Sequence, residues 1–230
     1  MRNMLQNIKE LQGDALAAVD GDIGHVRDFY FDDKKWVIRY VIADTGSWLP
    51  GRLVLLATNA FGKWDRYEKK LHLKLRKKQI LDSPSIDSHE PVSSQFETDY
   101  YRHYGWPVYW DEDGISGVDG NRGGRSQHRL RADKHLQSVL SVTGYPIQAA
   151  DGKIGHVSSF LVDDRTWTVG DLLVETGNWH SGKEILIPSR MVERISYEDS
   201  TVFVNLTKAE ILKTAERDPP WAKILSPKVS

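Results

Sequence analysis

Residues 20–48 read DGDIGHVRDFYFDDKKWVIRYVIADTGSW, and residues 151–179 read DGKIGHVSSFLVDDRTWTVGDLLVETGNW. The two stretches align without a gap at a constant offset of 131 residues, and 13 of the 29 aligned pairs are identical. The same offset extends outward, since Leu5 aligns with Leu136 and Leu75 with Leu206. A self-match of this length indicates that one structural unit was duplicated. Features that both copies share are expected to serve the fold, and features of one copy alone are candidates for function.

The repeat predicts two domains in this chain of 230 residues. We expect copy one at 1–82, a connecting segment at 83–134, copy two at 135–215 and an irregular tail at 216–230. With 40% hydrophobic and 27% charged residues, the composition is typical of a soluble globular protein. No stretch has the length of an apolar membrane helix or the core of a signal peptide, so we expect a cytoplasmic protein. The absence of cysteine excludes disulfides, zinc thiolate sites and cysteine nucleophiles.

The net charge of −1 argues against bulk nucleic-acid binding, but it conceals a difference between the copies. Residues 4–82 contain 14 Lys/Arg and 11 Asp/Glu, a net charge of +3. Residues 135–215 contain 7 and 10, a net charge of −3. Opposite charges could favour docking of one copy on the other, within or between chains. Neutral sequence divergence of solvent-exposed residues explains the opposite charges equally well.

The local pattern of each copy predicts short strands joined by tight turns. Asp20-Gly21 and Asp151-Gly152 indicate two-residue hairpins of type I′, with Asp and Gly at the two central positions. In copy one we expect strands at 15–19, 24–31, from Trp36 onward, 53–57 and 71–75, with equivalents in copy two. About six short strands and one helix in ~80 residues predict a mainly β fold of two small barrels related by internal duplication, each with a short C-terminal helix. Packed together, the barrels could mimic a homodimer with a pseudo-twofold axis.

These residues resemble a known family. The pattern DG-x-IG-H-V-x-x-F-x-x-DD-x-x-W, then a hydrophobic strand, T-G-x-W and G-[KR], is similar to the PRC-barrel family and recurs in both copies. That family takes its name from the cytoplasmic domain of the photosynthetic reaction centre H subunit, and a related barrel forms the C-terminal half of a ribosome maturation factor. The resemblance to the tandem PRC-barrel proteins of bacteria implies a fold more firmly than an activity.

The connecting segment contains an aromatic stretch, with seven Phe, Tyr or Trp residues between Phe96 and Trp110. Because disordered linkers are poor in aromatic residues, we expect this stretch to be ordered and packed on a barrel or on a partner. A tryptophan followed by a cation also recurs in one loop of each copy, either as an interface anchor or as a lid on the barrel. The candidate partner-binding residues are Trp48, Arg52, Trp179, Lys183, Tyr104, Trp106 and Trp110.

Copy one also carries a basic stripe that copy two lacks, with eight cations between residues 63 and 78. Such a stripe could bind phosphates or anionic headgroups, or it could be a solvated edge hairpin that lysines protect from aggregation. The candidate anion-binding residues are Lys63, Arg66, Lys69, Lys70, Lys74 and Arg76.

No constellation of residues positions a nucleophile against a base. His25 and His156 occupy matched positions, but one histidine per barrel is too few for a zinc site, so we expect them to support turns. The adjacent aspartates at 32–33 and 163–164 suit turn formation better than paired acid–base catalysis. We therefore expect no catalytic residues, no metal site and no cofactor.

We interpret the chain as a non-catalytic interaction or scaffold protein that binds a protein partner or associates with itself. Two alternatives remain open. One is an accessory of RNA processing or ribosome assembly, supported by the basic stripe. The other is a peripheral accessory of photosynthetic electron transport at a membrane, implied by the resemblance to the H subunit.

Overall fold

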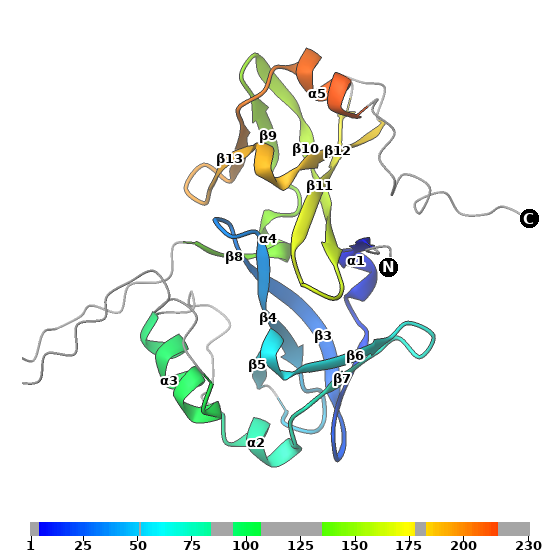
Figure 1. Ribbon diagram of the computed structural model, residues 1–230, viewed down its shortest axis with the longest axis vertical. Coiled ribbons are helices and arrows are strands. Elements are labelled where there is room, and N and C mark those ends of the chain that lie inside the picture. Colours follow the sequence, from blue (N-terminus) through cyan, green and yellow to red (C-terminus); the bar gives the residue numbers. More distant parts are fainter. Residues whose placement is uncertain (1–4, 51, 84–93, 107–134, 178–182, 216–230) are drawn as a thin grey trace, which may run out of the picture.

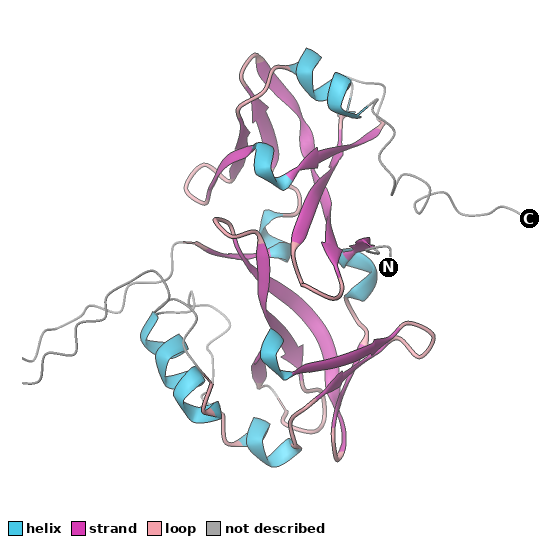
Figure 2. Cartoon of the chain, in the orientation of Figure 1, coloured by secondary structure: helices cyan, strands magenta, loops and turns pink. Residues whose placement is uncertain are grey.

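The computed structural model describes residues 5–50, 52–83, 94–106, 135–177 and 183–215. The fold is mainly β, with 51% of the described residues in strands and 20% in helices, which confirms the expected fold class. Each copy forms one sheet, and the two sheets follow one another along the long axis of the molecule (Figure 1 and Figure 2). Among the described residues, no helix has the length and apolar character needed to span a membrane.

The two sheets share one topology. In copy one the order is β5-β4-β3-β2-β7-β6, and in copy two it is β12-β11-β10-β9-β14-β13. Neighbouring strands are antiparallel except for the parallel pairs β2–β7 and β9–β14. The strands of copy one are β2 (Ala15–Ala18), β3 (Gly21–Asp32), β4 (Val37–Asp44), β5 (Leu53–Ala57), β6 (Phe61–Asp65) and β7 (Lys70–Leu73). Those of copy two are β9 (Pro146–Ala149), β10 (Gly152–Asp163), β11 (Val169–Glu175), β12 (Glu184–Pro188), β13 (Val192–Ser196) and β14 (Thr201–Val204).

Short helices lie at the ends of the sheets. The α-helices are α1 (Ile8–Leu11), α2 (Lys77–Leu81), α3 (Ser94–Tyr104), α4 (Val139–Val142) and α5 (Lys208–Ala215), and the 3-10 turns are η1 (Thr58–Ala60) and η4 (Ser189–Met191). Helices α2 and α5 are the terminal helices that the sequence predicts. Asp20 accepts a hydrogen bond from the first amide of α2, Lys77 N, at 2.8 Å, and Asp151 does the same for Lys208 N of α5 at 2.9 Å.

Each sheet gains its seventh strand from the other copy. The N-terminal strand β1 (Leu5–Asn7) pairs with β10, and β8 (Leu136–Ser138) pairs with β3 (Figure 1). Gln6 lies opposite Val162, and Gln137 lies opposite Phe31, so the two registers are related by the repeat offset. The sequence does not predict this reciprocal exchange, because a three-residue strand has no periodicity of its own.

A pseudo-twofold axis passes between Val37 and Thr168, which are equivalent positions and form an antiparallel bridge. The amide of Ile38 donates to the carbonyl of Trp167 at 2.7 Å, and the amide of Val169 donates to the carbonyl of Trp36 at 2.7 Å. Both tryptophans have left-handed backbone, with φ of 53° and 59°. The third strand of copy one therefore starts at Val37 rather than at Trp36, because the carbonyl of Trp36 accepts its hydrogen bond from the other copy. The exchanged strands, α1, α4 and this bridge are together called the seam.

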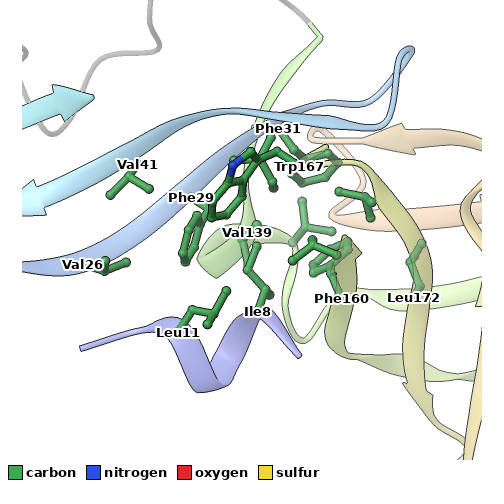
Figure 3. Close-up of a cluster of buried hydrophobic side chains, with 14 of the residues drawn as sticks. Ile8, Leu11, Val26, Phe29, Phe31, Val41, Val139, Phe160, Trp167 and Leu172 are labelled. Carbon is green, nitrogen blue, oxygen red and sulfur yellow. The ribbon is translucent and has the colours of Figure 1, made fainter. Parts of the chain in front are cut away.

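One continuous apolar core runs through the seam (Figure 3). Ile8 of α1 and Val139 of α4 are both buried between the copies. Trp167 of copy two enters the core of copy one, with its ring centroid 4.9 Å from that of Phe61 and 5.5 Å from that of Trp64. Because burial of one such side chain contributes about 1.5–3 kcal/mol, the seam is a substantial part of the folding free energy.

The Asp-Gly hairpins differ from the type I′ prediction. Ala18 pairs with Gly21, so Val19 and Asp20 form the two-residue loop, and neither has a positive φ. In copy two, Ala149 pairs with Gly152 in the same way. The aspartate occupies the loop because its carboxylate caps the terminal helix, which the local turn pattern does not reveal.

The repeated glycines at 24 and 155 have a steric reason. Gly24 has φ of 136°, and a Cβ there would lie 1.9 Å from the carbonyl oxygen of Asp44. Gly155 has φ of 155°, and its Cβ would lie 2.0 Å from the carbonyl oxygen of Glu175. Both positions require glycine because the neighbouring strand approaches too closely for any side chain.

Candidate functional site

The loop tryptophan and arginine of copy one are engaged inside the molecule. Trp48 packs against the core, and Lys77 Nζ lies 5.6 Å from the centroid of its ring. The guanidinium of Arg52 donates to the carbonyl oxygens of Leu81 at 2.8 Å and Ser83 at 2.5 Å. Both residues therefore hold the end of α2 against the barrel. This arrangement fits a lid on the barrel better than an anchor for a partner.

The equivalent loop of copy two is only partly described. Trp179 lies outside the described residues. Lys183 is exposed, and its carbonyl oxygen accepts a hydrogen bond from the hydroxyl of Thr176 at 2.7 Å. Lys183 thus remains a candidate for contact with a partner.

The aromatic segment packs on copy one through α3. The hydroxyl of Tyr100, which is fully buried, accepts from the amide of Ala57 and donates to the carbonyl of Leu55, each at 3.0 Å. Since β5 is the end strand of its sheet, this hydroxyl satisfies backbone groups that an edge strand leaves open. Tyr104 and Trp106 stack with ring centroids 4.6 Å apart and pack against the same cluster. Trp110 lies outside the described residues.

The candidate anion-binding residues divide into two groups. Arg66 pairs with Asp164 of copy two, Lys63 with Asp65 at 3.2 Å, and Lys70 with Asp22 at 3.4 Å. By contrast, Lys69, Lys74 and Arg76 are exposed and form no ion pair with any residue that the structure describes. The cations available to an anionic ligand are thus fewer than the sequence alone indicates.

The two histidines at matched positions lie on strands rather than at turns. His25 lies opposite Asp44 and His156 opposite Glu175, and His156 Nε2 is 3.3 Å from the Glu175 carboxylate. Both pairs are on the surface. Among the described residues, no group of three or more His, Asp or Glu could hold a metal ion.

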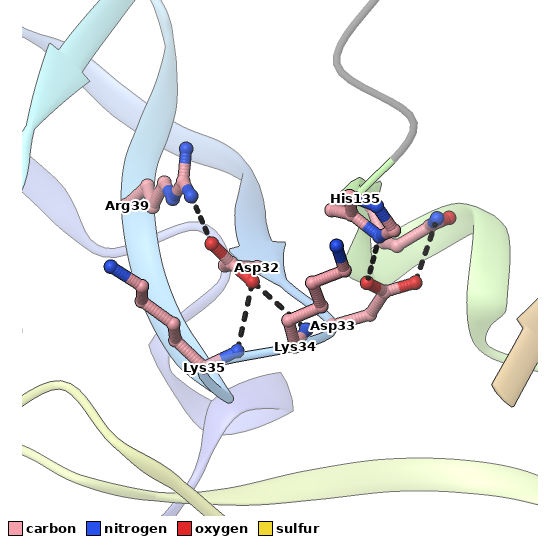
Figure 4. A network of polar contacts seen from close by, with 7 residues as sticks. Asp32, Asp33, Lys34, Lys35, Arg39 and His135 are labelled. Carbon is pink, nitrogen blue, oxygen red and sulfur yellow. Dashed lines mark hydrogen bonds and ion pairs between the residues drawn. The ribbon is translucent and has the colours of Figure 1, made fainter. Parts of the chain in front are cut away.

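The first aspartate of each pair shapes a turn, as predicted. Asp32 accepts from the amides of Lys34 at 2.8 Å and Lys35 at 2.9 Å, and it pairs with Arg39 (Figure 4). Burial alone would raise the pKa of Asp32, but these hydrogen bonds and the charge of Arg39 outweigh burial and lower the pKa. Asp163 accepts equivalent hydrogen bonds from the amides of Arg165 and Thr166, both at 2.9 Å.

The second aspartate of each pair reaches across the seam. Asp33 lies 3.0 Å from His135 Nδ1 and accepts from Gln137 Nε2 at 3.3 Å (Figure 4). Burial raises the pKa of the Asp33 carboxyl, and the contact with His135 opposes that rise. Asp164 of copy two forms the ion pair with Arg66 of copy one. The sequence places these aspartates at turns but does not reveal their partners, which are about a hundred residues away.

A buried carboxylate completes the polar part of the seam. Asp28 accepts from the hydroxyl of Ser138 at 2.6 Å and from the amide of Leu140 at 3.1 Å. Burial raises the pKa of Asp28, against the effect of these hydrogen bonds. The equivalent pair in copy two is Ser159 with Asn7, so the two halves of the seam differ chemically although their backbones match.

Among the residues that the structure describes, the most exposed aromatic side chains lie on the last hairpin of each copy. Tyr67 is fully exposed in the turn between β6 and β7, and Tyr197 is half exposed in the turn between β13 and β14. Neither residue was among the candidate sites predicted from the sequence. An aromatic residue in a turn signals exposure only after the register of the flanking strands is known.

A comparison with family models finds a PRC-barrel domain at residues 141–211, which lies within copy two. No curated protein matches the chain. The strand order of copy one repeats that of the matched domain.

Proposed function

We propose that this protein is a non-catalytic scaffold of two PRC barrels, built like the cytoplasmic domain of the reaction centre H subunit, that binds a protein partner. The observation that carries the proposal is the reciprocal strand exchange, which joins both barrels in one core. Such a body presents two related surfaces at a constant spacing, as a scaffold requires. The PRC-barrel match in copy two and the repeated strand order in copy one support a tandem arrangement.

Four aspartates of the turns and the seam support a binding role over a catalytic one. Asp32 and Asp163 are engaged by turn amides, and Asp28 and Asp33 by groups across the seam. A catalytic acid or base must instead be within reach of a substrate. Each of these four groups has its hydrogen-bonding partners inside the fold, so none is offered to a ligand.

The surface that best fits a partner is the β6–β7 hairpin of copy one. Tyr67 projects fully into solvent at its turn, and the exposed cations Lys69, Lys74 and Arg76 lie on the same hairpin or directly after it. Tyrosine and arginine are enriched at interface hot spots, and the lysines add positive charge around them. We therefore expect a partner with an acidic surface around an apolar pocket for the tyrosine.

The test is an affinity pull-down from the native host with tagged full-length protein, with and without nuclease, read by mass spectrometry. The wild type is compared with Tyr67→Ser and with Tyr197→Ser, a matched control on the other hairpin. We expect a nuclease-resistant protein that the wild type and Tyr197→Ser recover and Tyr67→Ser loses. Recovery of ribosomal proteins that nuclease abolishes would favour the RNA-processing alternative. Equal recovery by all three proteins would refute the hairpin as the binding surface.

A further inference from the structure

The strand pairs, the bridge and the ion pair of the seam are all formed by residues of the two copies themselves. The contacts between the copies use residues 5–11, 28–38, 61–66, 136–142 and 159–169. The described part of the connecting segment ends at Trp106, and the description resumes at His135 of copy two. The same contacts can therefore form whether the two copies belong to one chain or to two.

The seam is also selective for unlike copies. Asp28 of copy one accepts a hydrogen bond from Ser138 of copy two. If two units of copy one were paired instead, Asp28 would face Asn7, which is the residue equivalent to Ser138. The ion pair between Arg66 and Asp164 disfavours pairing of copy two with itself, because Tyr197 replaces the arginine at the equivalent position of copy two. Net charges of +3 and −3 on the copies oppose pairing of like with like. Copy one thus fits copy two better than it fits itself.

We propose that the seam also forms between molecules, so that copy one of one chain pairs with copy two of a second chain and the reverse. Two such seams close a dimer with twofold symmetry and leave no unpaired exchanged strand. The inference rests on the proposed scaffold function, because the dimer doubles the number of partner-binding hairpins. The occupant of each seam in the dimer is a second copy of this chain.

The balance between the closed monomer and the exchanged dimer depends on concentration. Since the contacts are the same in both, the ratio is set by the effective concentration of one copy near the other within a chain, on the order of millimolar for two linked modules. The monomer is favoured well below that value, and the dimer becomes populated as the protein concentration approaches it. Opening of the seam is needed first, so exchange is slow under native conditions.

The absence of native cysteine allows a direct test. Val37 and Thr168 face each other across the axis with hydrogen bonds on both sides, the closely spaced kind of antiparallel pair that suits a disulfide. Full-length Val37→Cys and Thr168→Cys are unfolded in urea, mixed, refolded together over a series of concentrations up to ~1 mM and oxidised. Val37→Cys refolded alone is the matched control, because collisions can link it to itself but the seam cannot.

We expect disulfide-linked dimers of the mixed pair to exceed the control by about tenfold, because a bridge across a formed strand pair has a high effective concentration. Their share should rise with protein concentration. The double variant Val37→Cys/Thr168→Cys in a single dilute chain should form the same bridge internally. If that internal bridge forms but the mixed pair yields no more dimer than the control, exchange between chains is refuted while the seam and the scaffold function stand. If the internal bridge also fails, the seam geometry itself is wrong.

Discussion

Replacement of Tyr100 by phenylalanine tests how α3 is held on copy one. The change removes one hydroxyl from a fully buried ring and leaves the amide of Ala57 and the carbonyl of Leu55 without their partner at the sheet edge. Each unsatisfied buried group costs about 1–3 kcal/mol, so we expect the loss of both to destabilise the docked state by about 2–6 kcal/mol in Tyr100→Phe. The ring itself remains, and its packing against Tyr40 and Trp106 should persist.

The assay combines urea unfolding with hydrogen exchange at the Ala57 amide. The matched control is Tyr145→Phe, whose hydroxyl makes no hydrogen bond with any residue that the structure describes. We expect a change below about 0.5 kcal/mol for this control, as for a substitution away from buried polar contacts. If Tyr100→Phe loses no more stability than the control and the Ala57 amide exchanges no faster, the hydroxyl does not satisfy the edge of β5 and the reasoning is wrong.

Three further predictions concern the fold and the seam. Gly24→Ala and Gly155→Ala should each lower the melting temperature far more than Gly46→Ala. A Cβ at either of the first two positions would lie within 2.0 Å of a carbonyl oxygen, whereas nothing lies within 4 Å of a Cβ at Gly46. Equal decreases in the melting temperature, measured by calorimetry, would contradict this. The left-handed φ at Gly46 alone should cost about 1–2 kcal/mol. Ile8→Ala should destabilise the protein by about 2–5 kcal/mol, because Ile8 is buried in the seam. Hydrogen exchange should become faster in β10 as well as in copy one. Faster exchange confined to copy one would disprove the shared core. The pKa of Asp28 is raised in the folded state by burial, so the stability linked to its protonation is fully present below the ordinary value of 3.8 and is lost as pH rises through the raised folded pKa. Wild type should therefore gain stability relative to Asp28→Asn as pH falls from neutral through that pKa, measured by urea unfolding, and a pH-independent difference would show that the carboxyl is not desolvated.

The sequence predicted most of the strands because their signals are local and repeated. The fourth strand of each copy was expected at 53–57 and 184–188, and the structure has it there. Asp32 was assigned to a turn, and its carboxylate accepts two turn amides. These features depend on residues within a few positions of one another, and the second copy provides an independent instance of each.

The seam was not predictable in the same way. Leu5–Asn7 is too short to show a strand period, and its partner β10 begins well over a hundred residues later. Only the outward extension of the repeat, in which Leu5 aligns with Leu136, hinted that these segments have a common role. The partners of Asp28 and Asp33 also depend on how two sheets meet, which no local pattern encodes.

The candidate partner-binding residues show a related limit. Trp48, Arg52, Tyr104 and Trp106 were chosen as aromatic or cationic residues in loops, and the structure engages all four within copy one. Composition identifies side chains that need a contact, but it does not say whether the contact lies inside the chain or outside it. The exposed Tyr67 illustrates the converse, since only the strand register reveals its position.

The measurement that tests the central claim most directly is residue-resolved hydrogen exchange by nuclear magnetic resonance on the full-length protein. The amides of Ile38 and Val169 donate across the pseudo-twofold axis, each at 2.7 Å, and belong to different copies. If reciprocal exchange joins the copies in one cooperative body, both amides should be protected to the same degree as Val41 and Leu172 in the centres of the two sheets. Rapid exchange at Ile38 and Val169 while Val41 and Leu172 remain protected would show that the two copies fold separately and that the seam does not hold them together.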